Sequence, residues 1–156
     1  MKVFKDAVGY NKDELVSDAF PIEELPALYV VTARSISASP IGSEDADAGE
    51  RKVINLVDAH RLVESGFDKK GYLVHLKNYL KAVEVHLHNN GGSDQVPEFK
   101  AAAQAAAKDI VDDFDSYSFY RGENMDDDGM VILARPSEGD TWTFSFWKHG
   151  LVAEQY

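Results

Sequence analysis

The sequence contains no cysteine among its 156 residues, and this absence excludes several kinds of chemistry. Without thiols the chain can form no disulfide, no thiolate zinc site and no cysteine nucleophile. No stretch approaches the roughly 18 consecutive apolar residues of a membrane-spanning helix, and residues 1–6 lack the apolar core of a signal peptide. We therefore expect a cytoplasmic protein that does not span a membrane.

The sequence also lacks the short motifs that mark common catalytic sites. Its glycines form neither a phosphate-binding loop nor a dinucleotide-binding fingerprint, and its serines have no nucleophile-elbow context. No catalytic residue can be nominated from the sequence. We predict that the protein is not an enzyme, needs no obligatory cofactor and works by binding other macromolecules.

Positive charge is scarce relative to negative charge. The chain has 27 acidic and 16 basic side chains, giving a formal net charge of -11. Such a field repels phosphate backbones and anionic lipids, so nucleic acid and membranes are not expected partners. Basic protein surfaces and divalent cations are the partners that it would attract, and an acidic surface kept for solubility is the alternative.

Apolar residues make up 44% of the chain, which is enough for one core in a single domain spanning 1–156. β-Branched and aromatic residues concentrate in short stretches that are typical of strands. These stretches are 3–4, 27–33, 53–58, 117–120, 130–134 and 141–147. Residues 35–52 are rich in Ser, Ala, Gly and acid and have no apolar periodicity, so we interpret them as a mobile acidic loop.

Apolar residues recur at spacings of three and four within 68–114, which predicts two helices joined by a short turn. Asp68 suits the N-cap of the first helix, and the run 89–92, Asn-Asn-Gly-Gly, predicts where that helix ends. Ser93 or Asp94 can cap the second helix. The order of strands, helical hairpin and strands predicts an α+β fold with a mainly antiparallel sheet.

Two groups of acidic residues are candidate calcium ligands. The run from Asn124 to Gly129 matches the first half of an EF-hand loop, with oxygen ligands at its first, third and fifth positions and glycine at its sixth. The twelfth position should be Glu but is Arg135. An acidic turn between strands is therefore the favoured interpretation, and a weak calcium site at Asp126 and Asp128 is the alternative.

The second group, Asp109, Asp112 and Asp113, lies at the predicted end of the second helix, where negative charge opposes the helix dipole. A solvated acidic face is the favoured interpretation, and a docking site for calcium or a basic partner is the alternative. The aromatic run 142–147 places large rings on both faces of a predicted strand. Core packing is the favoured explanation there, and an exposed binding surface is the alternative.

The run 119–125, Phe-Tyr-Arg-Gly-Glu-Asn-Met, followed by Asp-Gly-Met-Val at 128–131, resembles the C-terminal signature of the translationally controlled tumour protein family. The resemblance covers nearly the whole chain, including 1–6, 13–18 and the ending 146–151. It implies a twisted β-tent of mainly antiparallel strands with a long helical hairpin, similar to the fold of a zinc protein that binds Rab GTPases and to that of methionine sulfoxide reductases.

The resemblance implies a eukaryotic cytosolic protein that supports growth and survival. Its implied partners are small GTPases of the Rheb type, translation elongation factors, tubulin and calcium. Glu14 and Glu123 match the two acidic positions that the family uses for GTPase contact. Three places depart from the family pattern: the run 41–44 is Ile-Gly-Ser-Glu where the family has Ile-Gly-Gly-Asn, Val74 replaces a basic helix residue, and Arg121 replaces an apolar residue before Gly122.

Three functions are carried forward as hypotheses. The first is a binding hub whose acidic surface around Glu14 and Glu123 contacts a GTPase or an elongation factor. The second is a calcium-responsive accessory protein of microtubules, and the third is an enzyme that resembles methionine sulfoxide reductase. The third would have to work without the cysteines on which those reductases depend.

Overall fold

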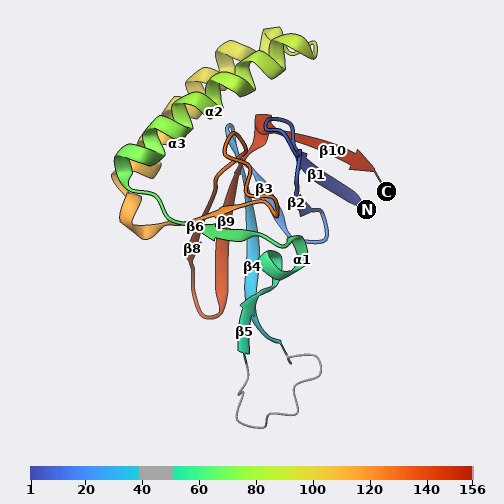
Figure 1. Cartoon of the computed structure of the whole chain (residues 1–156), viewed down its shortest axis with the longest axis vertical. Coiled ribbons are helices and arrows are strands. Elements are labelled where there is room, and N and C mark those ends of the chain that lie inside the picture. Colours follow the sequence, from blue (N-terminus) through green and yellow to red (C-terminus); the bar gives the residue numbers. More distant parts are fainter. Residues whose placement is uncertain (39–50, 156) are drawn as a thin grey trace.

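The computed structural model describes residues 1–38 and 51–155. Within them the chain forms ten β-strands and three α-helices, and the predicted α+β class is confirmed (Figure 1). The strands are β1 (Lys2–Asp6), β2 (Glu14–Ser17), β3 (Ile22–Glu24), β4 (Leu28–Ala38), β5 (Arg51–Ile54), β6 (Val63–Ser65), β7 (Ser118–Arg121), β8 (Ile132–Pro136), β9 (Thr141–Trp147) and β10 (Leu151–Gln155). The helices are α1 (Asn55–His60), α2 (Lys69–Asn89) and α3 (Val96–Asp112).

The strands form two antiparallel sheets. The main sheet has the order β3-β4-β9-β8-β7-β6, with β5 paired to β4, and the small sheet has the order β10-β1-β2. Because β1 pairs with β10, the two ends of the described chain lie side by side (Figure 1). The small sheet packs on one face of the main sheet, where the rings of Phe4 and Tyr29 are 5.6 Å apart. This contact fixes β1 and β2 relative to the strands of the main sheet.

The helical hairpin covers part of the opposite face of the main sheet. Tyr72 of α2 packs on Phe119 of β7 with ring centroids 5.1 Å apart, and Trp147 of β9 is only 1% exposed. Phe144 and Phe146 point to the other face and are fully buried. The aromatic rings on both faces of β9 therefore belong mainly to the core, as favoured from the sequence.

The ends of the hairpin helices follow local chemistry. The carboxylate of Asp68 accepts a hydrogen bond from the amide of Gly71 at 2.7 Å, which confirms the predicted N-cap of α2. The N-cap of α3 is Gln95, one or two residues after the caps expected at Ser93 or Asp94, because Ser93–Gln95 forms a 3₁₀ turn and α3 starts at Val96. None of the three α-helices in the described part is both long enough and apolar enough to cross a membrane.

Two predictions about the middle of the chain were wrong at their edges. The ends of the expected loop 35–52 form a paired ribbon, with Ser35 opposite Ile54 and Ala38 opposite Arg51, while residues 39–50 lie outside the described part. The second half of the expected strand 53–58 is helical, since α1 begins at Asn55. A short apolar run fits either a strand or a buried helical turn, so periodicity alone could not decide between them.

Candidate functional site

Two loops and the end of α1 meet at one corner of the molecule. The carboxylate of Asp13, in the loop between β1 and β2, accepts hydrogen bonds from the backbone amide of Asn124 at 3.1 Å and from its side-chain amide at 2.5 Å. A Cβ atom added to Gly122 would lie 2.5 Å from the same carboxylate, so the close approach requires glycine. We call Asp13, Glu14, His60, Arg61, Glu123 and Asn124 the acidic corner.

Glu14 is the first residue of β2, and its carboxylate points toward the end of α1. Its Oε1 lies 3.1 Å from Nδ1 of His60, whose side chain is only 5% exposed. Among the described residues, neither ring nitrogen of His60 has a partner that meets the geometric criteria for a hydrogen bond, so the contact with Glu14 is a close but poorly aligned one. Burial lowers the pKa of His60 even though Glu14 acts to raise it, and the imidazole is therefore neutral at pH 7.

Glu123 lies in the loop between β7 and β8 and is paired with the residue that follows His60. Nη1 of Arg61 donates a hydrogen bond to Oε1 of Glu123 at 3.1 Å, and the two side chains are 75% and 55% exposed. A pair this open to water contributes only about 0–1 kcal/mol to stability. The structure thus brings both predicted partner-binding residues, Glu14 and Glu123, next to the consecutive residues His60 and Arg61.

The backbone of the acidic corner is held in an unusual conformation. Within residues 1–38 and 51–155, only three residues other than glycine have positive φ: Lys12 (51°), Arg61 (54°) and Met125 (49°). One lies in each of the three segments that meet at the corner. Left-handed backbone at ordinary L-residues costs energy, and such positions cluster at functional sites.

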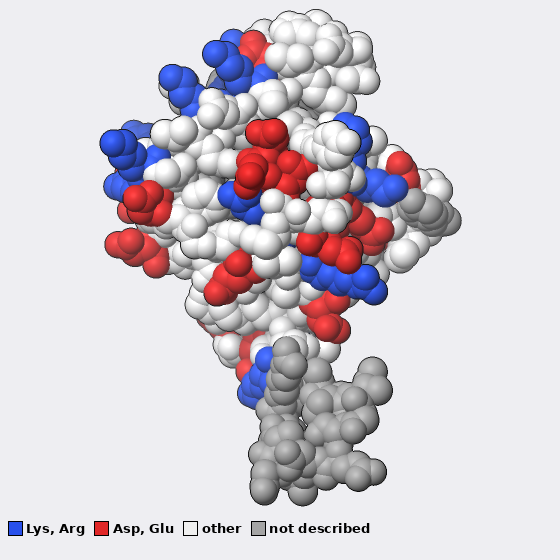
Figure 2. Space-filling view, viewed as in Figure 1, with Lys and Arg blue, Asp and Glu red and all other residues white. Residues whose placement is uncertain are grey.

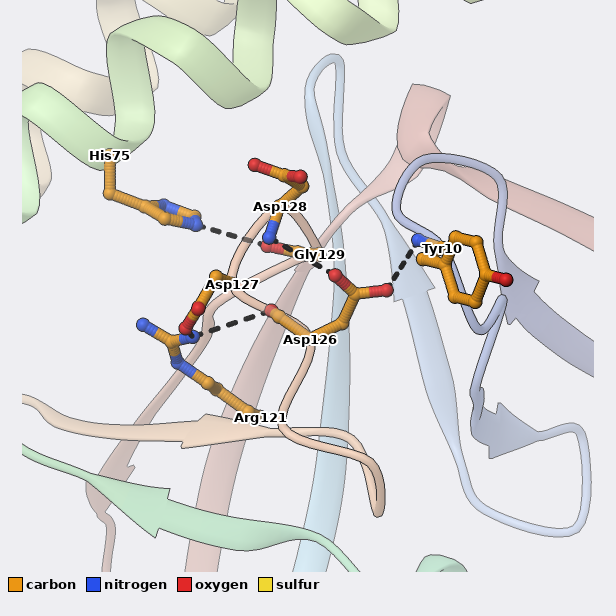
Figure 3. Close-up of polar contacts among 7 residues, drawn as sticks. All are labelled: Tyr10, His75, Arg121, Asp126, Asp127, Asp128 and Gly129. Atoms are coloured by element: carbon orange, nitrogen blue, oxygen red, sulfur yellow. Dashed lines mark hydrogen bonds and ion pairs between the residues drawn. The ribbon is translucent and has the colours of Figure 1, made fainter.

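Behind the corner, Asp126 fastens the β7–β8 loop to the β1–β2 loop (Figure 3). Its Oδ2 accepts hydrogen bonds from the backbone amides of Tyr10 and, at 2.9 Å, of Asn11, while its Oδ1 accepts one from the amide of Asp128 at 3.2 Å. Partial burial acts to raise the pKa of Asp126, but these amides and the charge of Arg121 outweigh it and lower the pKa.

The same loop is held from its other side by Arg121 and His75 (Figure 3). Nη1 of Arg121 donates to the carbonyl oxygen of Asp126 at 3.3 Å and to Oδ1 of Asp127 at 3.1 Å, while Nε2 of His75 lies 3.0 Å from the carbonyl oxygen of Gly129. The guanidinium of Arg121 also lies 5.1 Å from the centre of the Phe67 ring. The departure from the family pattern at Arg121 therefore has a structural role here.

Asp6, at the end of β1, also holds the β7–β8 loop, and it does so from inside the core. This carboxylate is 5% exposed and accepts hydrogen bonds from the backbone amide of Met130 at 2.7 Å, the amide of Val8 at 3.1 Å and the hydroxyl of Tyr79 at 3.1 Å. Burial raises the pKa of Asp6 to about 6, more strongly than these hydrogen bonds lower it. A Cβ atom on Gly129 would lie 2.9 Å from Oδ2 of Asp6, so the loop could not approach as closely with a side chain there.

The five candidate calcium ligands fall on two separate elements. Asp109 and Asp112 lie on the last turns of α3, and Asp113, which follows them, accepts a hydrogen bond from Nη1 of Arg135 at 3.0 Å. Asp126 and Asp128 lie on the β7–β8 loop. Among the described residues, no group of three or more His, Asp or Glu side chains is placed to hold a metal ion.

Sequence analysis did not identify His60, Arg61, Asp13 or Asp6 as parts of these networks. Their contacts join segments far apart in the chain, and no local pattern reports them.

The surface around the acidic corner is rich in carboxylates. Figure 2 shows acidic side chains gathered below the helical hairpin, with a few basic side chains among them. The exposed fractions of Glu14 and Glu123 are 48% and 55%. Both carboxylates can therefore be reached by a cationic group of another molecule.

Known proteins resemble this chain over nearly its whole length. The family model described as translationally controlled tumour protein matches residues 1–152. A Dictyostelium discoideum homologue is 42% identical and a Yarrowia lipolytica homologue 39% identical, with 100% and 99% of both chains covered. The structure of the Schizosaccharomyces pombe protein has a TM-score of 0.85 at 34% identity and full coverage of both chains.

A solution structure from Caenorhabditis elegans has a TM-score of 0.70 at 22% identity, covering 100% of this chain and 99% of the other, and supports the fold alone. The match to the family model and the identities above 30% over entire chains go further than fold. The chain belongs to the translationally controlled tumour protein family.

Proposed function

We propose that this protein is a cytosolic, non-enzymatic binding protein that uses the acidic corner to contact a basic surface of a partner. The candidate partners are a small GTPase of the Rheb type and a translation elongation factor, in support of growth and survival. The observation that carries the proposal is the convergence of Glu14 and Glu123, which lie far apart in the sequence, on His60 and Arg61.

The charge and exposure of the corner favour association with a cationic surface. Two exposed carboxylates in a protein of net charge -11 speed the encounter with a basic partner and orient it. The hydrogen bonds that Asn124 donates to Asp13 hold the backbone of the corner before binding. Less conformational entropy is then lost when the complex forms.

The chemistry of the corner favours binding over catalysis. Its six residues include one imidazole but no hydroxyl or thiol that could act as a nucleophile. An enzyme that resembles methionine sulfoxide reductase would need cysteine, and the chain contains none. We therefore propose partner binding without turnover.

An amide NMR titration of the labelled protein with a Rheb-type GTPase tests the proposal. We expect shifts around Glu14, Arg61 and Glu123, and a several-fold weaker complex for Glu14→Gln and for Glu123→Gln. Glu138→Gln is the matched control, because Glu138 is an exposed acid in the turn between β8 and β9. An elongation factor is titrated in the same way.

The outcomes separate the alternatives. Shifts at the corner with only one of the two proteins identify the partner class. Shifts that avoid the corner, or equal affinities for Glu14→Gln and Glu138→Gln, would contradict the assignment of this surface.

Calcium and tubulin binding remain predictions from the family resemblance. If calcium binds, the same experiment without a partner protein should show calcium-dependent shifts at Asp109, Asp112 and Asp113, or at Asp126 and Asp128. Both oxygens of Asp126 already accept backbone hydrogen bonds, so a site in that loop would have to draw mainly on Asp128. Binding of tubulin in a co-sedimentation assay, with and without calcium, tests the accessory role.

A further inference from the structure

The middle of α3 lacks bulky side chains on the side that faces the main sheet. Six alanines lie between Lys100 and Lys108, and Ala102, Ala105 and Ala106 border a hollow against the sheet. Alanine ends at Cβ and cannot fill the space between two layers as Leu or Phe would. The composition of the helix therefore creates the cavity.

The sheet surface across the hollow is also built from small or polar side chains. Val30 of β4 pairs with Ser145 of β9, and Arg135 of β8 pairs with Thr143 of β9. Paired residues of adjacent strands point to the same face, so all four side chains lie toward α3. The hollow is open on one side and has a volume of about 580 Å³, which lies within the roughly 300–1,000 Å³ of small-molecule sites, and its lining is mostly apolar.

Three of the residues that line this hollow, Arg135, Thr143 and Ser145, carry hydrogen-bond donors. The guanidinium of Arg135 lies 5.2 Å from the centre of the Tyr117 ring and uses Nη1 to bond Asp113. Its other N–H groups and the hydroxyls of Thr143 and Ser145 are further donors among the residues that line the hollow. These groups can donate to an acceptor on a ligand.

The charges around the cavity restrict the ligand further. The carboxylates of Glu23 and Asp109 line the hollow and disfavour an anion, while Arg135 disfavours a cation beside it. An uncharged molecule meets neither repulsion. A flat, mostly apolar body suits the alanines and Val30, and one carbonyl or ether oxygen suits the donors.

A second groove, of about 450 Å³, lies between α2 and α3 on the outside of the hairpin. It is more open to solvent and is flanked by Lys77, Lys81 and Lys100. Nothing in the described residues indicates what would cover it. The cavity under α3 is more enclosed and its walls come from two layers, so it defines a ligand more closely.

We propose that the cavity between α3 and the main sheet is a binding site for a small, uncharged, largely apolar molecule that carries a hydrogen-bond acceptor. The site lies on different residues from the acidic corner. It stands whether or not the proposed contact with a GTPase or an elongation factor is correct.

Prodan, an uncharged naphthalene dye with one carbonyl acceptor, is a suitable probe. We expect saturable binding to the full chain with a blue shift in its fluorescence. Ala106→Leu should weaken binding by about tenfold or more, because a leucine side chain occupies the space of the ring, and should keep or raise Tm because it fills a hollow. Ala101→Leu is the control, since Ala101 is exposed and lines neither cavity.

Thr143→Val provides a second test that does not depend on packing at α3. It preserves the side-chain shape and removes one donor, so we expect binding to weaken by about fivefold with Tm nearly unchanged. The proposal is overturned if prodan shows no saturable binding, or if folded Ala106→Leu and Thr143→Val bind as tightly as the parent protein. Leu73→Ser changes the outer groove instead. The proposal is also overturned if Leu73→Ser abolishes prodan binding while Ala106→Leu and Thr143→Val still bind the dye.

Discussion

Two pairs of acidic residues, Asp6 with Asp126 and Glu14 with Glu123, have different environments. Asp6 and Asp126 direct their carboxylates at backbone amides and fasten the loop to β1 and to the β1–β2 loop. Glu14 and Glu123 are half-exposed and contact side chains instead. Acids of the first kind stabilise the fold, and acids of the second kind remain available to another molecule.

The family signature thus combines two roles within one stretch of chain. Glu123 and Asp126 are three residues apart in 119–131, yet substitution of Asp126 removes bonds to three backbone amides and substitution of Glu123 removes one exposed ion pair. Loss of binding in a variant of this segment therefore needs a stability measurement beside it. Without one, disruption of the loop cannot be told from loss of a contact.

The largest expected effect is the contribution of Asp6 to the pH dependence of the free energy of unfolding. Because its pKa is raised from 3.8 to about 6 in the folded state, the native protein holds a proton that the unfolded chain has released between these values. Stability should therefore fall as pH rises from about 4 to 6, with a contribution from Asp6 of about 3 kcal/mol. Urea unfolding at several pH values measures it.

Asp6→Asn cannot titrate and should lack this decline, whereas the control Glu138→Gln should retain it. Other groups add their own pH dependence, and His60, His75 and His149 act oppositely because burial lowers their pKa. The difference between the parent protein and Asp6→Asn isolates the contribution of Asp6. If the free energy of unfolding changed with pH in the same way in both proteins, Asp6 would not be the source of the decline.

A smaller loss is expected when the loop is pushed away from Asp6. In Gly129→Ala the added Cβ would lie 2.9 Å from Oδ2 of Asp6 and 3.2 Å from Cβ of Asp126, so the loop has to move. We expect a loss of about 2 kcal/mol in the free energy of unfolding, typical of overpacking. Gly66→Ala is the matched control, because a Cβ there meets no atom within 4 Å, and an equal loss in both variants would show that the close approach is not the cause.

Removal of the Asp126 carboxylate should cost less, because the amides that it releases can reach water. Asp126→Ala should lose about 1 kcal/mol of stability, and its amide NMR shifts should change at Tyr10 and Asn11. Asp128→Ala should stay within about 0.5 kcal/mol of the parent, since its carboxylate is exposed. If Asp126→Ala and Asp128→Ala were equally stable, the hydrogen bonds of Asp126 would not stabilise the fold. Asp126 would then resemble Glu14 and Glu123.

The sequence specified the hairpin and most central strands because their apolar residues repeat with a clear period. The cap at Asp68 and the end of α2 followed from local chemistry as well. It did not specify the short strands β2, β3, β6 and β10, whose three to five residues give too little periodicity. Glu14 and Glu123 came from the family resemblance, whereas Arg61 and Asp13 are defined by contacts across the fold that no single segment encodes.

The smallest expected effect concerns Arg61, and it tests most directly whether Glu123 contacts a cationic partner. This residue occupies the Glu123 carboxylate that we assign to a cationic partner, so partner and Arg61 compete for the same oxygen atoms. Arg61→Gln should leave stability within about 0.5 kcal/mol, because the pair is exposed, and should tighten the complex by about two- to threefold by freeing Glu123. Titration of a Rheb-type GTPase, with Lys81→Gln as a control for the loss of one positive charge elsewhere, measures the change. Weaker binding by Arg61→Gln would instead make Arg61 itself a contact residue and place a carboxylate of the partner at the corner.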